Sequence, residues 1–353
     1  MNTSIRPSGL SNLLSKVVCL LLIFICWSCT QSSETEKYQK KRDNIVNVKD
    51  KIKEIAIDDI LIGRMAQTRL IDNYLIIGDY RSPDKLIHIF DKNDFHYITS
   101  TTYQGQGPGE IANMGHIAID EAHRKFYVSD HGKQKIFSYD LDSVLNNPYY
   151  EPAVKADMNI GLFPSEYRYF NDTLCIGRII QPIGSNNFKP IVGKWNMQTG
   201  EIKLMKYEHP DIKKKRMTSD VSFEHGIYAE CYSNYDLMTI CDLDGNLKYN
   251  IYGPKWENEL GPTLHYTMQP AFCGNKIIAG YSGEDGRGEG SYPTKFIVFD
   301  LAGNYLQTLE TGYKIADFCY DKENNRIIMC MNDDIQFGYL DLNSYYQISQ
   351  PIS

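Results

Sequence analysis

Seven charged or imidazole side chains could do chemistry in this sequence, because they recur at intervals of about 50 residues. They are Arg64, His116, Glu166, Arg168, Asp220, His265 and Asp317. The three carboxylates offer the oxygen ligands that calcium prefers. A histidine with an ordinary pKa can act as a general base, and the arginines could instead neutralise the acids. Which of these outcomes holds depends on the elements that position the seven side chains.

Catalytic motifs of known chemistry are absent from the sequence. It contains no His-Glu-x-x-His, no Gly-x-Ser-x-Gly, no phosphate-binding loop and no dinucleotide fingerprint. Its eight histidines never pair at metal-ligand spacing. We therefore expect no cofactor and no tightly held metal.

Two series of strand-like segments repeat along the chain with the same period. The first series begins at Tyr74, Phe126, Leu174, Ile227, Ile277 and Ile327, and the second ends at Asp91, Asp140, Asn196, Asp242, Asp300 and Asp341. Each repeat has room for one more strand on either side. Four strands at a period of about 50 residues are typical of a β-propeller blade. The sequence therefore predicts an all-β fold, a six-bladed β-propeller with four antiparallel strands per blade.

A closed ring requires that the two ends of the domain pair, since an open ring leaves sheet edges exposed. The segment 46–57 has strand character and precedes the first blade. We expect it to pair with the last blade near residues 337–342, so that N- and C-terminal strands close the ring. Cys319 and Cys330 lie on neighbouring predicted strands of that blade, and their register decides whether they can form a disulfide.

The predicted connections differ in length between the two faces of the ring. One face has tight turns such as Asp244-Gly245. The other has long connections, at residues 104–113, 181–190, 210–219, 254–266 and 283–294. Long loops on a rigid scaffold commonly carry function, so we expect binding on this long-loop face. The seven candidate residues, with Gln67 and Met114, fall near the starts of the innermost strands and would line the channel mouth there.

The N-terminus has the composition of an export signal. Arg6 and Lys16 precede a short apolar run, too short to span a bilayer, that ends at Cys26-Trp27-Ser28-Cys29. This pattern resembles a bacterial lipoprotein signal, which implies a signal peptide over 1–28 and lipidation of Cys29. Residues 29–44 are polar and are predicted to form a flexible tether. One domain would then span 45–353. Thr30 after the cysteine favours the outer membrane, with the domain facing the periplasm or the medium.

The charge balance argues against a nucleic-acid partner. The chain has a net charge of −7, and removal of Arg6 and Lys16 leaves −9. Nucleic-acid binding needs clustered positive charge. The only basic block is Lys213-Lys214-Lys215-Arg216, which we interpret as a solvated loop rather than as a binding site.

The second repeat carries a family resemblance. Gln106-Gly-Pro-Gly-Glu110, Gly115–Asp120, Phe126–Asp130 and Lys135–Asp140 together look like one NHL repeat. With the lipoprotein signal in front, the mature chain resembles the TolB-like six-bladed propeller lipoproteins of Bacteroides and relatives. The resemblance implies a fold and a location, but no agreed activity.

Two functions follow from these observations. The first is a lipid-anchored module of the cell envelope that binds a protein partner, a glycan or a peptide through its long-loop face, rather than an enzyme. The alternative is a metal-dependent hydrolase or lactonase at the channel mouth. Propeller lactonases hold a divalent cation there, and Glu166, Asp220 and Asp317 would be the ligands, of calcium for example. His116 or His265 would be the general base.

Overall fold

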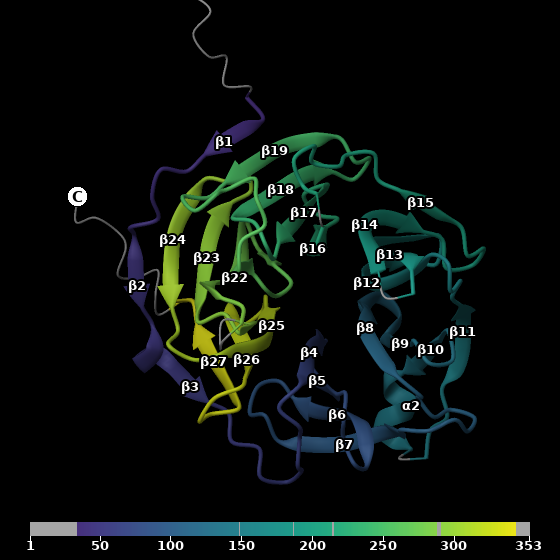
Figure 1. Ribbon diagram of the computed structural model, residues 1–353. Coiled ribbons are helices and arrows are strands. Elements are labelled where there is room, and N and C mark those ends of the chain that lie inside the picture. The colour runs from purple at the N-terminus through teal and green to yellow at the C-terminus, as the bar shows by residue number, and fades with distance from the viewer. Residues whose placement is uncertain (1–33, 148, 186, 214, 288–290, 344–353) are drawn as a thin grey trace, which may run out of the picture.

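A computed structural model describes residues 34–147, 149–185, 187–213, 215–287 and 291–343. Six small antiparallel sheets stand around a central axis, which confirms the predicted six-bladed β-propeller (Figure 1). Among the described residues, no helix is both long and apolar enough to cross a membrane.

The strands of blades one to five run outward from the axis in chain order, and blade six takes its outermost strand, β3, from the N-terminal part of the chain. Blade one has β4 (Ala66–Ile71), β5 (Tyr74–Asp79), β6 (Lys85–Asp91) and β7 (Tyr97–Tyr103); blade two has β8 (Met114–Asp120), β9 (Lys125–Asp130), β10 (Lys135–Asp140) and β11 (Ala153–Asp157); blade three has β12 (Phe163–Asn171), β13 (Leu174–Gly184), β14 (Asn187–Trp195) and β15 (Ile202–Leu204). Blade four has β16 (Met217–Ser222), β17 (Ile227–Tyr232), β18 (Leu237–Asp242) and β19 (Leu247–Tyr252); blade five has β20 (Thr263–Tyr266), β21 (Ala271–Cys273), β22 (Lys276–Asp285), β23 (Lys295–Asp300) and β24 (Tyr305–Glu310); blade six has β25 (Ile315–Asp321), β26 (Arg326–Met331), β27 (Phe337–Asp341) and β3 (Ile52–Glu54). The short helices are η1 (Lys49–Lys51), η2 (Glu121–His123) and α2 (Leu141–Asn146).

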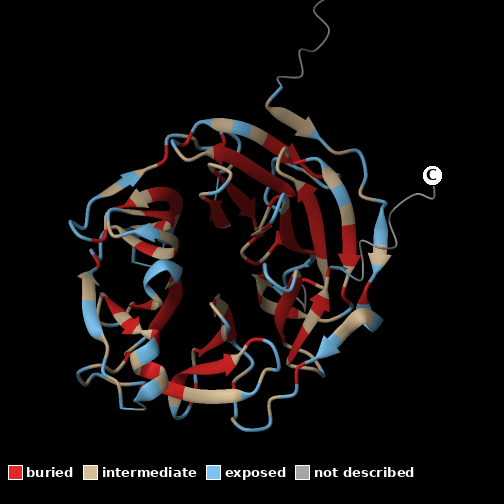
Figure 2. Ribbon diagram, turned by 180° about the vertical axis from the view of Figure 1, so that it is seen from behind, coloured by how far each residue is buried: buried red, intermediate tan, exposed pale blue. Residues whose placement is uncertain are grey.

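The hydrophobic core is divided into clusters that each lie between two neighbouring blades. On β26, for example, Ile327 and Met329 pack toward blade five, whereas Ile328 and Cys330 pack toward blade one. Because both faces of such a strand are buried, its sequence is a continuous apolar run rather than an alternating one. The buried residues accordingly fill the inner and middle strands, and the outer strands are more exposed (Figure 2).

Polar side chains join the innermost strands of neighbouring blades across one repeat. Gln67 Nε2 donates to the carbonyl of Gly115 at 2.7 Å, and its Oε1 accepts from the N–H of Ile117 at 3.1 Å. Gln269 Nε2 likewise donates to the carbonyl of Ser219, 50 positions earlier, at 2.9 Å. These hydrogen bonds therefore link neighbouring blades around the channel, and the residues that they join are separated by about one sequence repeat.

The two ends of the domain pair as predicted. β3 joins β27 as an antiparallel fourth strand, with Gly338 opposite Glu54 and Leu340 opposite Ile52. Two further strands extend this pairing backward along the ring: β2 (Ile45–Asn47) lies parallel to β24, and β1 (Glu36–Tyr38) lies parallel to β19. Residues 34–54, here called the N-terminal strap, thus cover the outer edges of blades four, five and six in turn (Figure 1).

The strap corrects the prediction of a flexible tether over residues 34–44, the described part of the predicted segment 29–44. Its polar side chains bind the ring directly: Glu36 accepts from the Asn250 amide at 3.0 Å and from the Tyr252 hydroxyl, and Tyr38 stacks on Tyr252 with ring centroids 4.3 Å apart. Arg42 is buried against Asp236. The segment lacks aliphatic residues because it attaches by hydrogen bonds, aromatic contacts and charge. Cys29 and the predicted signal over 1–28 lie outside the described residues.

Two of the predicted long loops are extended β-structure. β13 and β14 remain paired almost to their tip, with Pro182 opposite Phe188, so residues 181–190 form a protruding hairpin. β22 likewise continues to Asp285 and pairs with β20. The described cysteines are free. Cys330 lies opposite Asp317 and Cys319 opposite Ile328, so the two cysteines are out of register for a disulfide.

Candidate functional site

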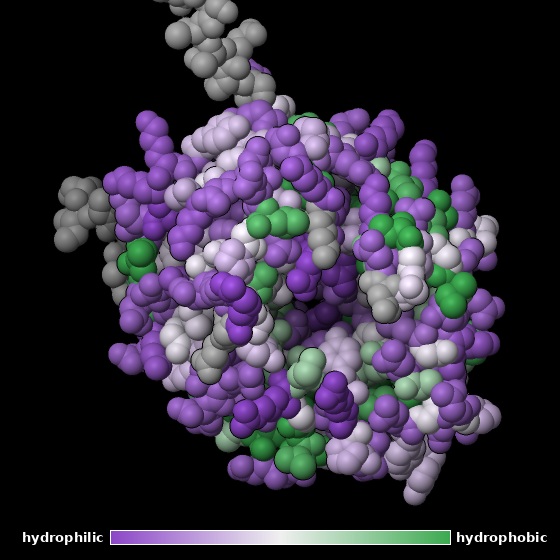
Figure 3. Space-filling model, in the orientation of Figure 1, coloured by the Kyte–Doolittle hydropathy of each residue, from purple (hydrophilic) through white to green (hydrophobic). Residues whose placement is uncertain are grey.

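Two cavities lie along the central channel. The smaller, about 320 Å³, is at the long-loop end and is lined by residues that include His116, Glu166 and Asp317. The larger, about 660 Å³, is at the tight-turn end, and Arg168 and Asp220 line it. Arg69 and Gln269 line both and so mark the boundary between them. A space-filling view shows the hollow at the centre of the ring with chiefly hydrophilic walls (Figure 3).

Each of the three candidate acids is held by an arginine. Arg168 binds Asp220 through Nε at 2.6 Å and Nη2 at 3.2 Å, and Arg178 Nη2 binds Glu166 Oε1 at 2.6 Å.

Asp317 Oδ2 accepts from the N–H of Thr68 at 2.6 Å and from Arg69 Nη1 at 3.2 Å. Burial raises the pKa of Asp317, against the opposing effect of Arg69. The three acids thus belong to separate ion pairs and do not converge on one point as a calcium shell requires.

His116 is buried in the channel wall as a neutral ring. Its Nε2 lies 2.8 Å from the carbonyl of Tyr167, so this nitrogen carries the proton and donates. Its Nδ1 is then the acceptor, and it faces Arg69 Nη2 at 3.4 Å. Burial, with Arg69 and Arg168 nearby, lowers the pKa of His116 well below its usual range. Because both nitrogens are engaged, His116 joins blades two and three and is poorly placed to act as a general base.

Two of the seven candidate residues lie elsewhere. Arg64 is exposed on the loop before β4 and lines neither channel cavity. His265 is buried on β20, where its Nδ1 lies 3.2 Å from the Tyr281 hydroxyl. The prediction placed both at the starts of innermost strands, but blade one begins two residues later, and in blade five β20 pairs with the far end of β22.

Arg69 and Arg178 are the channel residues that the sequence reasoning missed. Arg69 shares a face of β4 with Gln67, two residues earlier, so the period of two could have found it. Arg178 follows Gly177 in a strand that the sequence did predict, and it donates to Ser165 Oγ at 2.9 Å and to the carbonyl of Met217 at 3.1 Å. Both arginines link strands of different blades.

A third cavity of about 990 Å³ opens on the long-loop face between blades three and four. One wall is the β13–β14 hairpin, with Ile183, Phe188 and Lys189. The other is the connection from β15 to β16, residues 205–216. Five basic residues line this cavity, which we call the cationic cleft: Arg178, Lys189, Lys213, Lys215 and Arg216. Lys213, Lys215 and Arg216, from the basic block that the sequence analysis interpreted as a solvated loop, therefore lie in the wall of a cleft.

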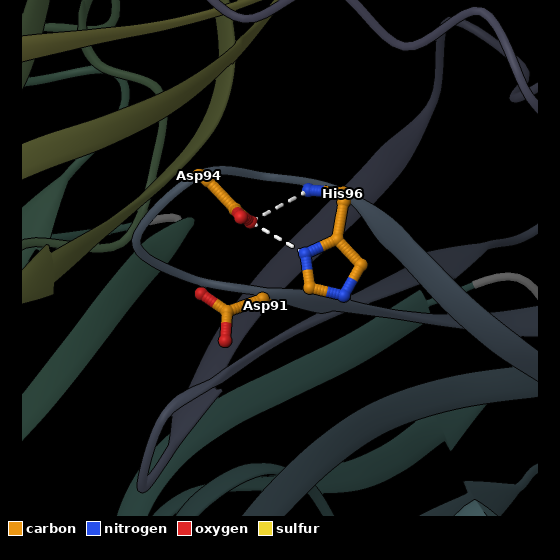
Figure 4. Close-up of side chains that lie close together, drawn as sticks. All are labelled: Asp91, Asp94 and His96. Atoms are coloured by element: carbon orange, nitrogen blue, oxygen red, sulfur yellow. Dashed lines mark hydrogen bonds and ion pairs between the residues drawn. The ribbon is translucent and has the colours of Figure 1, made fainter.

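Within the described part of the chain, one group of side chains has the proximity of metal ligands: Asp91, Asp94 and His96 at the turn between β6 and β7 (Figure 4). His96 Nδ1 already lies 2.6 Å from Asp94 Oδ1, and Asp91 accepts from the N–H of Asn93 at 2.7 Å. Asp94 and His96 are mostly exposed. The group is a hydrogen-bonded surface turn, remote from the channel and from the cationic cleft.

Comparison with known proteins supports the fold. The profile of the DUF5128 family, described as a 6-bladed beta-propeller, matches residues 24–161. No curated protein matches the chain. A crystal structure of a DUF4221 family member from Bacteroides vulgatus is similar, with a TM-score of 0.54 at 11% identity, over 82% of this chain and 98% of that one.

The β-propeller domain of Cps50 (Swd1) from Myceliophthora thermophila is also similar. Its TM-score is 0.50 at 10% identity, over 82% of this chain and 99% of that one. At such low identity these likenesses bear on the fold alone. Sheet topology, the family profile and the solved structures agree that the chain is a six-bladed β-propeller.

Proposed function

We propose that this protein is a lipid-anchored module of the cell envelope that binds a partner through its long-loop face. One contrast carries the proposal: the channel acids are neutralised by arginines, whereas the cationic cleft is open and two of the five basic residues described in it, Lys213 and Arg216, lack such pairing. Lys213 and Arg216 are exposed there, and no acidic partner for either is found among the described residues. Groups that are available to a ligand therefore lie on the long-loop face.

The anchor belongs to the same proposal. The resemblance to a lipoprotein signal and to TolB-like and NHL-repeat propellers supports lipidation at Cys29 and an outer-membrane location. The strap begins at Glu34, five positions after Cys29, so a lipid there would hold the outer edge of blade four within about 18 Å of the headgroups. The strap lies along the outer edges of the blades, so an attachment there would not cover the long-loop face.

The channel geometry does not support the alternative of a metal-dependent hydrolase. Its three ligands would each have to leave an arginine before they could share a cation, and its proposed bases are His116, with both nitrogens engaged, and His265, away from the channel. We therefore propose no second function.

Binding is tested by photo-crosslinking in cells that express the full chain. A photoreactive amino acid replaces Ile183 at the rim of the cationic cleft, and in a matched variant it replaces Lys322, which is 75% exposed on the tight-turn face. We expect a discrete crosslinked species from position 183 and not from position 322. Adducts from position 322 alone, or equal adducts from both, contradict the proposal.

Anchoring is tested separately with Cys29→Ser. We expect the wild-type chain to sediment with membranes and to incorporate labelled fatty acid, and the variant to lose both properties. Retention of the variant in the membrane fraction would show that Cys29 does not carry the anchor.

A further inference from the structure

We infer that the cationic cleft binds an acidic oligosaccharide, whose carboxylate or sulfate groups pair with Lys213 and Arg216 while a sugar ring packs on Phe188. The inference rests on the proposed function and names the ligand class for the same face. Three features of the cleft support it: its charge, the fixed position of its basic loop, and its apolar wall.

The charge of the cleft opposes that of the whole protein. Among its described lining residues, five are basic and one, Glu208, is acidic, in a chain of net charge −7. Lys189 pairs with Glu208 at 2.8 Å and Arg178 with Glu166 at 2.6 Å. Lys213 and Arg216 are the exposed basic residues of the cleft that have no acidic partner among the described residues. A concave surface of one sign concentrates ligands of the other sign, so the cleft selects an anion.

The loop that carries these two cations is held by buried contacts. Between them in sequence, Lys215 is buried, with Nζ 2.8 Å from Glu230 Oε2 in an ion pair that lacks hydrogen-bond alignment. Glu230 also accepts from the Tyr232 hydroxyl at 2.8 Å. Lys215 thus fixes the loop to β17 while Lys213 and Arg216 line the cleft with exposed side chains. A loop ordered before binding loses less entropy when the ligand arrives.

The other end of the loop is fixed through His209. Its Nδ1 accepts from the N–H of Asp211 at 3.2 Å, so Nε2 carries the proton and donates to the Tyr252 hydroxyl at 2.9 Å. Trp256 packs edge-on against His209, with ring centroids 5.7 Å apart. Both ends of the basic loop are therefore anchored on blade four.

The facing wall presents apolar side chains to solvent. Ile183 is 56% exposed and Phe188 is 53% exposed, both near the tip of the β13–β14 hairpin. A sugar ring offers C–H groups on one face and polar groups at its edge, so it can pack on an aromatic ring while its acidic substituent meets a cation. A small inorganic anion would use the charges alone and would leave Phe188 without a contact.

An extended peptide fits the cleft less well, because the exposed edge of β14 is interrupted. The carbonyl of Val192 accepts from the N–H of Met205, so Val192 faces the outer edge of the blade. Pro190, two residues earlier, faces the same edge and has no N–H to donate. A peptide cannot continue the ladder of main-chain hydrogen bonds past this point. Recognition must therefore come from side chains.

The test is calorimetric titration of the purified full chain, in detergent and at fixed ionic strength. The ligands are a tetragalacturonate, a chondroitin sulfate tetrasaccharide, neutral maltotetraose, a poly-Glu peptide and a single-stranded oligonucleotide. We expect at least one acidic oligosaccharide to bind and maltotetraose not to bind. The first two ligands distinguish carboxylate from sulfate recognition.

Two cleft variants and one control locate the site. K213A/R216A should weaken binding about tenfold or more, because it removes two charge-assisted contacts, and Phe188→Ala should weaken it about fivefold. K203A/K248A removes two exposed lysines from the outer strands β15 and β19 and should leave affinity within about twofold. All these side chains are exposed, so unchanged thermal unfolding verifies that each variant folds.

Three results would overturn the inference: no acidic oligosaccharide binds, poly-Glu or the oligonucleotide binds as tightly as the sugar, or K213A/R216A binds like wild type. If the sugars fail while position 183 still crosslinks to a partner, the ligand class is wrong and the proposed function stands. If both experiments fail, both proposals are wrong.

Discussion

Replacement of Arg42 by methionine should loosen the N-terminal strap and destabilise the protein strongly. Arg42 is 8% exposed and its partner Asp236 is fully buried, with Nη1 and Oδ1 2.9 Å apart. Arg42 also donates to the Tyr266 hydroxyl at 3.0 Å and to Gln39 at 2.9 Å. Methionine keeps most of the stem and removes the charge, so Asp236 would remain buried without its cation.

The expected loss follows from how Asp236 is otherwise bound. Removal of one partner from a buried ion pair costs about 3–5 kcal/mol. Asp236 would keep the N–H of Lys255 at 3.1 Å and the Tyr281 hydroxyl at 3.3 Å, so we expect about 3 kcal/mol, at the lower end. At an unfolding entropy of about 2.1 cal/mol/K per residue, this corresponds in a domain of this size to a decrease in Tm of about 5 °C.

Urea unfolding of the full chain, followed by tryptophan fluorescence, measures the effect. Lys41→Met is the matched control, since Lys41 pairs with Asp43 at the exposed surface and its loss should leave stability nearly unchanged. Asp236→Asn and the double variant complete a cycle, in which the second substitution should cost much less than the first. If Arg42→Met unfolds like Lys41→Met, the strap is not held by this pair and the reasoning is wrong.

Three further predictions concern the ring. A Cβ on Gly177 would lie 2.1 Å from the carbonyl oxygen of Glu166 in β12, so Gly177→Ala should cost about 2 kcal/mol or more in urea unfolding, whereas Gly184→Ala, whose nearest neighbour is 3.8 Å away, should be nearly neutral; equal effects would refute the close packing. Burial lowers the pKa of His116 and of His209, so as the pH falls the unfolded chain binds protons before the folded protein does. Stability should therefore be full above about pH 6.5 and decline from there to about pH 5.5. A urea midpoint that stays flat or rises as the pH falls over this range would contradict this. Elemental analysis should find no stoichiometric calcium or zinc and chelation should leave Tm unchanged, because Glu166, Asp220 and Asp317 are paired with arginines; one equivalent lost together with stability would restore the metal site.

The strand series was predictable because of where these strands lie. A strand such as β26 has blades on both sides, so Ile327 to Met331 are all apolar and stand out in the sequence. The turns between these strands accept only a few residue types and can therefore be recognised in the sequence. Gly245, with its positive φ of 80°, is an example. The closure by β3 followed from the need to remove the open edges.

The channel was less predictable because its contacts join residues on different strands, from 12 positions apart for Glu166 and Arg178 to 248 for Arg69 and Asp317. Glu166 and Asp220 were identified as polar residues of innermost strands, but nothing in the sequence says that Arg178 and Arg168 would neutralise them. The same limit applies to the strap: Glu36 and Arg42 look like ordinary solvated charges until Tyr252 and Asp236 are placed beside them. Local composition does not reveal a contact across 194 residues.

The strap also has a consequence for the order in which the protein can fold. β1 pairs with a strand that begins 211 residues later, and β3 pairs with β27, which is synthesised last among the described strands. Blades one to three can form as the chain emerges, but the outer edges of blades four to six stay open until the first strands return to them. Closure is therefore a late, high-contact-order step, and the species before it carries unpaired edges that invite association. Residues 34–54, which complete the ring, therefore also cover the edges that would otherwise promote association.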